Sequence, residues 1–184
     1  TLTKGNVAGG PGGPGGAIFS EESITVKNST LALNTAARGG AIQVQGHPLN
    51  KVLIVGSTFS GNVATGGWGG ALYLTTGKGT TVLNSSIVGN TAVSGGGGAF
   101  FGLTASSDIK TKVIVTGSVF RGNSSLSGGG GIAANLNDRT ILISKSEISG
   151  NTSAAFGGGL YLNNSALAMT GGTIAGNSST AISD

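Results

Sequence analysis

The chain has 184 residues, enough for one domain, with a net charge of +4 and only 9% charged residues. It has no cysteine, which excludes disulfide bonds and thiolate metal sites. It also has no run of about 20 apolar residues, so the sequence predicts no membrane-spanning helix.

Two short phrases alternate along the chain. The first is a Gly-Gly phrase, at Gly15–Ile18, Gly39–Ile42, Gly69–Leu72, Gly97–Phe100, Gly129–Ile132 and Gly157–Leu160. The second is an apolar residue three positions before an asparagine, at Leu31/Asn34, Phe59/Asn62, Ile87/Asn90, Phe120/Asn123, Ile148/Asn151 and Ile174/Asn177. The asparagines are 28, 28, 33, 28 and 26 residues apart, and a period of this size indicates a stacked repeat.

Apolar residues alternate with polar or small ones inside each repeat, which is the pattern of β-strands. Eight positions before each asparagine stand Val26, Ile54, Val82, Val115, Ile143 and Met169, and ten before stand Ile24, Val52, Thr80, Val113, Ile141 and Leu167. The segment after the Gly pair alternates as well, as in Leu72/Leu74. No sustained period of about 3.6 residues predicts a helix.

The sequence therefore predicts an all-β protein, a parallel β-helix with about six coils of roughly 28 residues and three short strands per coil. We expect a right-handed coil, because right-handed crossovers dominate the connections between parallel strands. The whole of residues 1–184 is interpreted as a single β-helix segment.

The asparagine column predicts a structural corner. Asn accepts left-handed backbone angles better than most residues, and stacked amides can hydrogen-bond along the rod as a ladder. We expect this role for Asn34, Asn62, Asn90, Asn123, Asn151 and Asn177. The Gly pairs are expected at another corner, where they supply positive φ, and they do not form a phosphate loop because no helix follows them.

Neither end of the sequence carries an obvious cap. Asn6 stands 28 residues before Asn34, as if in the tail of an earlier repeat, and the sequence after Asn177 ends in mid-coil. Open solenoid ends expose strand edges. We expect a fragment of a longer repeat protein, whose partners are further coils of that protein or a second copy stacked end to end.

The phrases Gly69–Leu72 and Phe59–Asn62 resemble the repeat of the chlamydial polymorphic outer membrane proteins and of related bacterial and algal surface proteins. The resemblance covers about residues 15–177, with departures such as Gly131 and Gly159 in place of Ala and Leu31 in place of Phe. It implies a right-handed parallel β-helix in the exported part of an extracellular or cell-surface protein, often with an adhesive role.

The acidic residues give little support to catalysis. They are Glu21, Glu22, Asp108, Asp138, Glu147 and Asp184, with no D-x-D run, and the one histidine, His47, has no evident partner. Asp108 and Asp138 lie in equivalent loops one coil apart, and a carbohydrate-active enzyme would need them close together over a groove. We predict no catalytic residue, no metal site, no cofactor and no enzyme activity.

Two surface features could bind a partner. One is an outward column with four aromatic members, Phe19, Tyr73, Phe101 and Tyr161, beside Gln43 and Ala133. Exposed rings in a row favour binding of glycans or of host or cell-surface proteins. The alternative is that neighbouring structure covers them, or that they only reflect the preference of aromatic residues for strands.

The other feature is a basic edge in the loops between the first and second strands, with Lys51, Lys78, Lys110, Lys112 and Arg139. It could attract acidic polysaccharide or serve as solubilising charge. No interleaved basic and aromatic motif is present, so we expect no nucleic-acid partner.

The sequence thus favours a non-enzymatic structural or adhesive segment of a large extracellular or cell-surface protein. One alternative is a fragment of a carbohydrate-active β-helix enzyme. The other is an ice-binding solenoid, which needs a flat threonine face. The relevant column reads Thr30, Thr58, Ser86, Val119, Glu147 and Thr173, and two of its members interrupt such a face.

Overall fold

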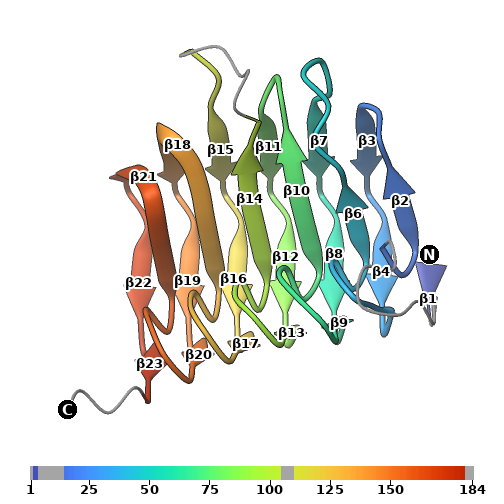
Figure 1. The fold of residues 1–184 in the computed structure, drawn as a ribbon. Helices are drawn as coiled ribbons and strands as arrows, with labels where there is room; N and C mark the ends of the chain where they lie inside the picture. Colours follow the sequence, from blue (N-terminus) through green and yellow to red (C-terminus); the bar gives the residue numbers. More distant parts are fainter. Residues whose placement is uncertain (1, 4–14, 105–109, 181–184) are drawn as a thin grey trace.

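A computed structural model describes residues 2–3, 15–104 and 110–180 of the chain. Over these ranges the chain forms 23 strands and no helix, and the strands stack into one parallel β-solenoid (Figure 1). None of the described residues therefore belongs to a helix long and apolar enough to cross a membrane. Asn6 and Asp108 lie outside the described residues.

Each coil contributes to three long faces, which confirms the three strands per coil predicted from the sequence. Face 1 consists of β2 (Ile18–Ser20), β6 (Ile42–Val44), β10 (Leu72–Thr76), β14 (Ala99–Leu103) and the first parts of β18 (Ile132–Ser144) and β21 (Leu160–Thr170). Face 2 consists of β3 (Ile24–Lys27), β7 (Val52–Val55), β11 (Thr80–Leu83), β15 (Val113–Thr116) and the second parts of β18 and β21.

Face 3 consists of β1 (Leu2–Thr3), β4 (Thr30–Ala32), β8 (Thr58–Ser60), β12 (Ser86–Val88), β16 (Val119–Arg121), β19 (Glu147–Ser149) and β22 (Thr173–Ala175). A fourth, short column follows, with two residues per coil: β5 (Thr35–Ala36), β9 (Val63–Ala64), β13 (Thr91–Ala92), β17 (Ser124–Ser125), β20 (Thr152–Ser153) and β23 (Ser178–Ser179). The sequence pattern did not reveal this short column, because two residues are too few to show an alternation.

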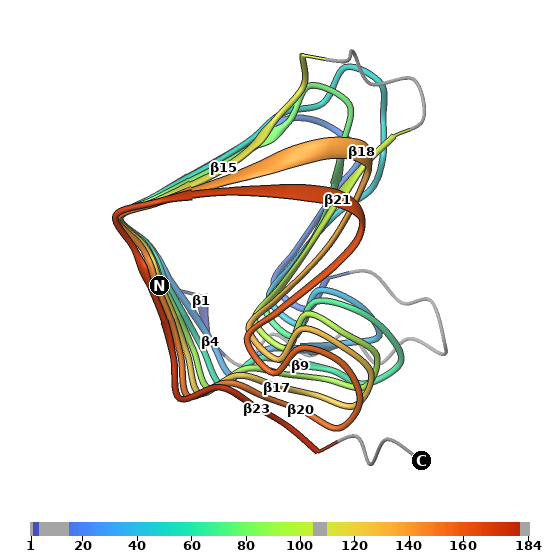
Figure 2. The ribbon, with the colours of Figure 1, turned by 90° about the vertical axis from the view of Figure 1, so that its left-hand side faces the viewer.

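The handedness follows from the view along the rod. In Figure 2 the C-terminal coil, drawn in red, lies nearest the viewer. Its chain runs leftward along the top in β21, down the left side in β22 and rightward along the bottom in β23. The chain therefore runs counterclockwise while successive coils advance toward the viewer, which is a right-handed coil, as expected from the rule for parallel crossovers.

The core is a set of inward columns that run the length of the rod. Ile24, Val52, Thr80, Val113, Ile141 and Leu167 pair in one register across face 2, as the spacing predicted. On face 3 the apolar residues Leu31, Phe59, Ile87, Phe120 and Ile148 are all buried. Burying one such side chain stabilises the fold by about 1.5–3 kcal/mol, so the stacked columns supply the main driving force for folding.

The prediction that Phe101 faces outward is wrong. Phe101 is 0% exposed and lies in the core, and Phe100 takes the outward position. The four glycines at 95–98 allow the Gly-Gly phrase to be read in two registers. The observed register buries Ala99, Phe101 and Leu103, whereas the other register would have turned Gly102 inward and left the core underfilled.

The six repeat asparagines form a continuous amide ladder. From Asn34 to Asn151 each side-chain Nδ2 donates to the Oδ1 of the asparagine in the next coil, at 2.8–2.9 Å, and each backbone N–H donates to the same oxygen, at 2.9–3.0 Å. From Asn62 onward each Nδ2 also donates to a backbone carbonyl of the preceding coil, such as Leu31 O for Asn62. These bonds satisfy buried amides that would otherwise be costly.

The asparagines do not themselves adopt left-handed backbone angles, contrary to the expectation. The residue before each of them does so: Leu33, Gly61, Gly89, Gly122, Gly150 and Gly176, with φ of 59–63°. The left-handed residue makes the bend, and the asparagine holds the bend through its amide. Glycine occupies five of these six positions because it adopts positive φ without the backbone strain that a residue with a Cβ would carry.

A serine ladder lies at the corner between faces 2 and 3. The backbone N–H groups of Ser29, Ser57, Ser85 and Ser118 each donate to the hydroxyl of the serine in the next coil, at 3.1–3.2 Å. The hydroxyls in turn donate to carbonyls two residues earlier in the chain. The sequence held a signal for it, since a serine stands five positions before each asparagine from Asn34 to Asn151.

Candidate functional site

The outer side of face 1 carries a row of residues in register, here called the outer row. It consists of Phe19, Gln43, Tyr73, Phe100, Ala133 and Tyr161. The predicted members Phe19, Tyr73 and Tyr161 lie in it, and Phe100 stands where Phe101 was expected. Phe19 is 42% exposed and lies at the N-terminal end of the row, while Tyr73, Phe100 and Tyr161 are half-buried.

Two further aromatic residues reach the row from the neighbouring corner. A left-handed glycine precedes each strand of face 1 from β6 onward, and the residue before that glycine lies at the corner. These corner residues are Arg38, Trp68, Gly95, Gly128 and Phe156, before Gly39, Gly69, Gly96, Gly129 and Gly157. Trp68 and Phe156 thus join the site although they lie on no predicted strand. The signal that could have revealed them is their position directly before Gly69 and Gly157.

The rings form two groups in contact. Phe100 stacks on Tyr73 with centroids 5.2 Å apart and meets Trp68 in a tilted contact at 5.1 Å. The guanidinium of Arg38 lies 5.7 Å from the centroid of Tyr73, within the range of a cation–π contact. Farther along the rod, Phe156 and Tyr161 stack with centroids 5.9 Å apart.

Two glycines make room for these rings. A Cβ on Gly95 would lie 2.5 Å from the Trp68 ring, and one on Gly128 would lie 3.0 Å from the Tyr161 ring. Trp68 therefore leans toward the C-terminal coils and Tyr161 toward the N-terminal coils. The two ring groups face each other across the coils of Gly95 and Gly128, and the small side chain of Ala133 separates them in the outer row.

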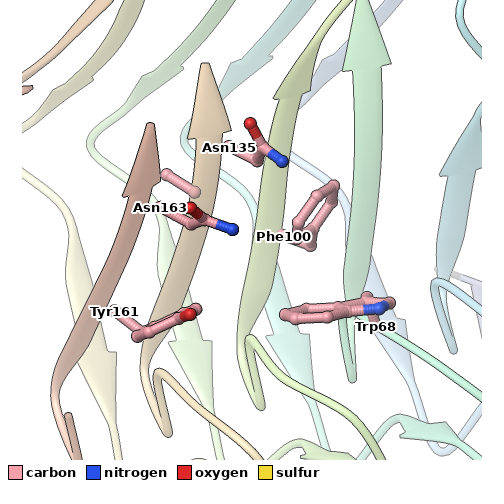
Figure 3. Close-up of a pocket in the computed structure, with 6 residues that line it drawn as sticks. Trp68, Phe100, Asn135, Tyr161 and Asn163 are labelled. Carbon is pink, nitrogen blue, oxygen red and sulfur yellow. The ribbon is translucent and has the colours of Figure 1, made fainter. Parts of the chain in front are cut away.

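A groove of about 190 Å³ opens between the two groups. It is lined by Trp68, Phe100, Ala134, Asn135, Tyr161 and Asn163, and is called the aromatic groove below. Figure 3 shows Trp68 and Phe100 on one side, Tyr161 and Asn163 on the other, and Asn135 above and between Phe100 and Asn163. Asn135 and Asn163 pair in register on β18 and β21, two residues after Ala133 and Tyr161, so both amides lie on the outer side of face 1.

One polar atom in the groove lacks a partner. The Oδ1 of Asn135 is buried and accepts no hydrogen bond within the described part of the chain. A buried acceptor without a partner costs about 1–3 kcal/mol.

The groove lacks charge, and the predicted basic edge lies elsewhere. Lys51, Lys78, Lys110, Lys112 and Arg139 stand in the connections between faces 1 and 2, or at their bend on β18, and the four lysines are exposed. Arg139 Nη1 donates to the carbonyl of Asn137 at 2.6 Å. The structure therefore separates the basic edge from the aromatic groove.

The other candidate groups form no site within the part of the chain that the structure describes. His47 is exposed, and its Nδ1 accepts from the backbone N–H of Leu49 at 3.3 Å. Asp138 is exposed at the bend of β18, and Asp108, its proposed partner, lies outside the described residues. Among the described residues no group of three His, Cys, Asp or Glu side chains could hold a metal ion.

The column considered for an ice-binding face lies in register on face 3, but it is not a uniform row of threonines. Its members are Thr30, Thr58, Ser86, Val119, Glu147 and Thr173. Glu147 projects from it and forms an ion pair with Arg121, with the closest N–O distance 2.7 Å. Hydrogen bonds from the hydroxyl of Ser149 and from Arg121 hold the pKa of Glu147 below its usual range. This cluster breaks the flat face that an ice-binding surface requires.

A comparison with protein families supports the resemblance noted in the sequence. The family model of the Chlamydia polymorphic membrane protein repeat matches residues 56–75, which span Phe59–Asn62 and Gly69–Leu72. The match covers one repeat of the parallel solenoid, so this part of the β-helix is similar to the polymorphic membrane protein repeat. No curated protein and no solved structure matches the chain.

Proposed function

We propose that the chain is a non-enzymatic adhesive segment of a protein displayed at the cell surface or outside the cell. The matched repeat is that of the Chlamydia polymorphic membrane proteins, which are surface proteins, and this supports the location. The rod itself serves as a scaffold that holds side chains in fixed rows. In this proposal its working part is face 1, where the aromatic groove contacts a partner.

The observation that carries the proposal is the concentration of rings on one side of the rod. Tryptophan and tyrosine bury much area at little cost in side-chain entropy and are typical of binding surfaces. The chain has nine aromatic residues, and Phe19, Trp68, Tyr73, Phe100, Phe156 and Tyr161 lie on or beside the outer row. The amide and serine ladders keep the coils in register beneath them.

Adhesion of coated beads tests the proposal. Beads carrying the 184-residue chain are washed over surfaces coated with neutral polysaccharide or with extracted cell-surface proteins. We expect retention on at least one surface, with a several-fold loss for the double variant Trp68→Ala/Tyr161→Ala. Phe19→Ala is the matched control, because this ring lies in the same row but outside the groove.

Two results would contradict the proposal. One is equal retention of beads carrying the double variant and of beads carrying the unchanged chain. The other is cleavage of polysaccharide, seen as new reducing ends or unsaturated sugars, which would favour the carbohydrate-active alternative. Circular dichroism of each variant ensures that only folded chains are compared.

A further inference from the structure

We infer that the aromatic groove binds a single neutral pyranose ring of a glycan, held between Phe100 with Trp68 on one side and Tyr161 on the other, and hydrogen-bonded to Asn135. This inference rests on the proposed adhesive function and names the class of its ligand.

The dimensions of the groove favour one ring. Its volume of about 190 Å³ is below the range of about 300–1,000 Å³ that is usual for drug-sized ligands. Phe100 and Tyr161 stand two coils apart, about 9.6 Å between their backbones, and Tyr161 leans over Gly128 toward Phe100, so the gap between the ring groups is narrower than this backbone spacing.

The chemistry of the lining favours a sugar over a purely apolar ligand. The faces of aromatic rings carry partial negative charge, and they attract the slightly positive C–H groups on the face of a pyranose. The buried Oδ1 of Asn135 accepts no hydrogen bond in the described part of the chain and points away from Trp68 and Tyr161 in Figure 3. Rotation of this amide would turn the oxygen toward the groove, where a sugar hydroxyl would supply the missing donor. The exposed amide of Asn163, one coil farther on, offers both a donor and an acceptor to a second hydroxyl.

The charge of the lining favours a neutral sugar. None of the six residues that line the groove is charged. The guanidinium of Arg38 lies over Tyr73, which does not line the groove. A uronic acid would therefore lose hydration of its carboxylate without gaining a counter-charge, and burial of an unpaired charge is costly.

The strands beneath the groove argue against a peptide ligand. Both neighbours of β14 are occupied, by β10 and β18, and β18 is paired in turn with β14 and β21. The free edge of β21 lies on the side away from Phe100, so a peptide that added there as a further strand would not enter the groove. The short groove also leaves no room for successive side-chain pockets.

The fluorescence of Trp68 gives a direct readout, because it is the one tryptophan of the chain. The 184-residue chain is titrated with neutral disaccharides of glucose, galactose, mannose and N-acetylglucosamine, and with digalacturonate as the charged counterpart. We expect a saturable change in emission with at least one neutral disaccharide and none with digalacturonate. Unchanged emission with every neutral sugar up to about 50 mM, a very weak affinity, would overturn the inference.

Variants separate binding from folding. Asn135→Ala removes a buried acceptor that has no partner, so its melting temperature should stay the same or rise, while affinity falls about tenfold or more. Phe19→Ala, in the same row but outside the groove, should keep the affinity. Equal affinity of Asn135→Ala and the unchanged chain would contradict the role of Asn135, and a short aromatic peptide that displaces the sugar would show that the groove does not select for sugars.

The two proposals fail in different ways. If coated beads adhere while no neutral sugar binds in solution, the adhesive function stands and the sugar site is wrong. If sugars bind in solution while beads do not adhere, the sugar site stands and the adhesive function is wrong.

Discussion

The side-chain Nδ2 of Asn90 donates to Oδ1 of Asn123 over 2.9 Å, although the two residues are 33 positions apart in the chain. The neighbouring steps of the ladder, from Asn62 to Asn90 and from Asn123 to Asn151, have the same length and span 28 residues. The longer repeat contains the long connection between β14 and β15. The ladder therefore keeps its geometry while the loops of single coils vary.

Loss of one ladder amide should destabilise the whole rod. Asn90→Ala removes the acceptor of the Asn62 N–H and the donor to the carbonyl of Phe59. Each buried group left without a partner costs about 1–3 kcal/mol, so we expect a loss of about 2–5 kcal/mol in the free energy of unfolding. Lys78→Ala, at an exposed loop position, should change it by less than about 0.5 kcal/mol. Thermal unfolding by circular dichroism measures both, and similar melting temperatures would refute the structural role of the ladder.

Leu33 occupies a left-handed position that glycine occupies in the other coils. Its φ is 59°, and its side chain is 57% exposed, so little burial offsets the strain. Leu33→Gly should stabilise the chain by about 1 kcal/mol, since the left-handed region costs a residue with a Cβ about 1–2 kcal/mol. Gly89→Ala is the converse test and should lower the stability of the chain. A Cβ at this position meets nothing within 4 Å, so only the strain of the left-handed backbone can act. A loss of stability in Leu33→Gly would contradict this account.

The two adjacent phenylalanines of β14 should respond differently to truncation. Phe101→Ala leaves a cavity in the core and should cost about 3–5 kcal/mol. Phe100→Ala removes outer ring contacts to Tyr73 and Trp68 and should cost about 1–2 kcal/mol. Denaturant unfolding compares the two variants. A larger cost for Phe100→Ala would mean that β14 lies in the other register.

Much of this architecture could be predicted from the sequence, and the exceptions have physical causes. The period, the inward columns and the amide ladder follow from residues that recur at fixed spacing, such as Ile54, Phe59 and Asn62. The register of β14 did not follow, because four successive glycines fit the same phrase in two ways.

The aromatic groove could be predicted only in part. Tyr161 lies on a patterned strand and was found from the alternation. Trp68 and Phe156 stand at a corner, and their approach to the outer row depends on the space left by Gly95 and Gly128 in other coils. Contacts between coils of this kind are not visible in the pattern of a single repeat.

The stability of the chain should fall in acid through Glu147. Its pKa is lowered in the folded chain by hydrogen bonds from Ser149 and Arg121. The stabilisation is therefore fully present above the pKa of an unfolded glutamate, about 4.3, and is lost as the pH falls through the lower folded-state value. Melting temperatures measured between about pH 6 and pH 2 should show a smaller acid-induced fall for Glu147→Gln than for the unchanged chain. Identical profiles would show that this ion pair does not contribute.

The last described coil should promote self-association. Ile174 is 46% exposed, whereas Ile148, the residue in register with it one coil earlier, is fully buried. We expect sedimentation velocity to show association of the 184-residue chain that grows with concentration, since exposed strand edges and apolar columns template pairing. Ile174→Lys should weaken it, and Lys78→Ala should not. A monomer at all concentrations would contradict this expectation.

The direction of the ladder bonds also sets how the rod bears mechanical load. The hydrogen bonds between coils, including those of the asparagine ladder, run from one coil to the next along the rod. A force that peels the chain from one end would break a single coil at a time, whereas a force applied sideways at face 1 would be shared by neighbouring coils. In the proposed adhesive role, a partner that pulls sideways on the aromatic groove would load the rod in this second direction, in which neighbouring coils share the force.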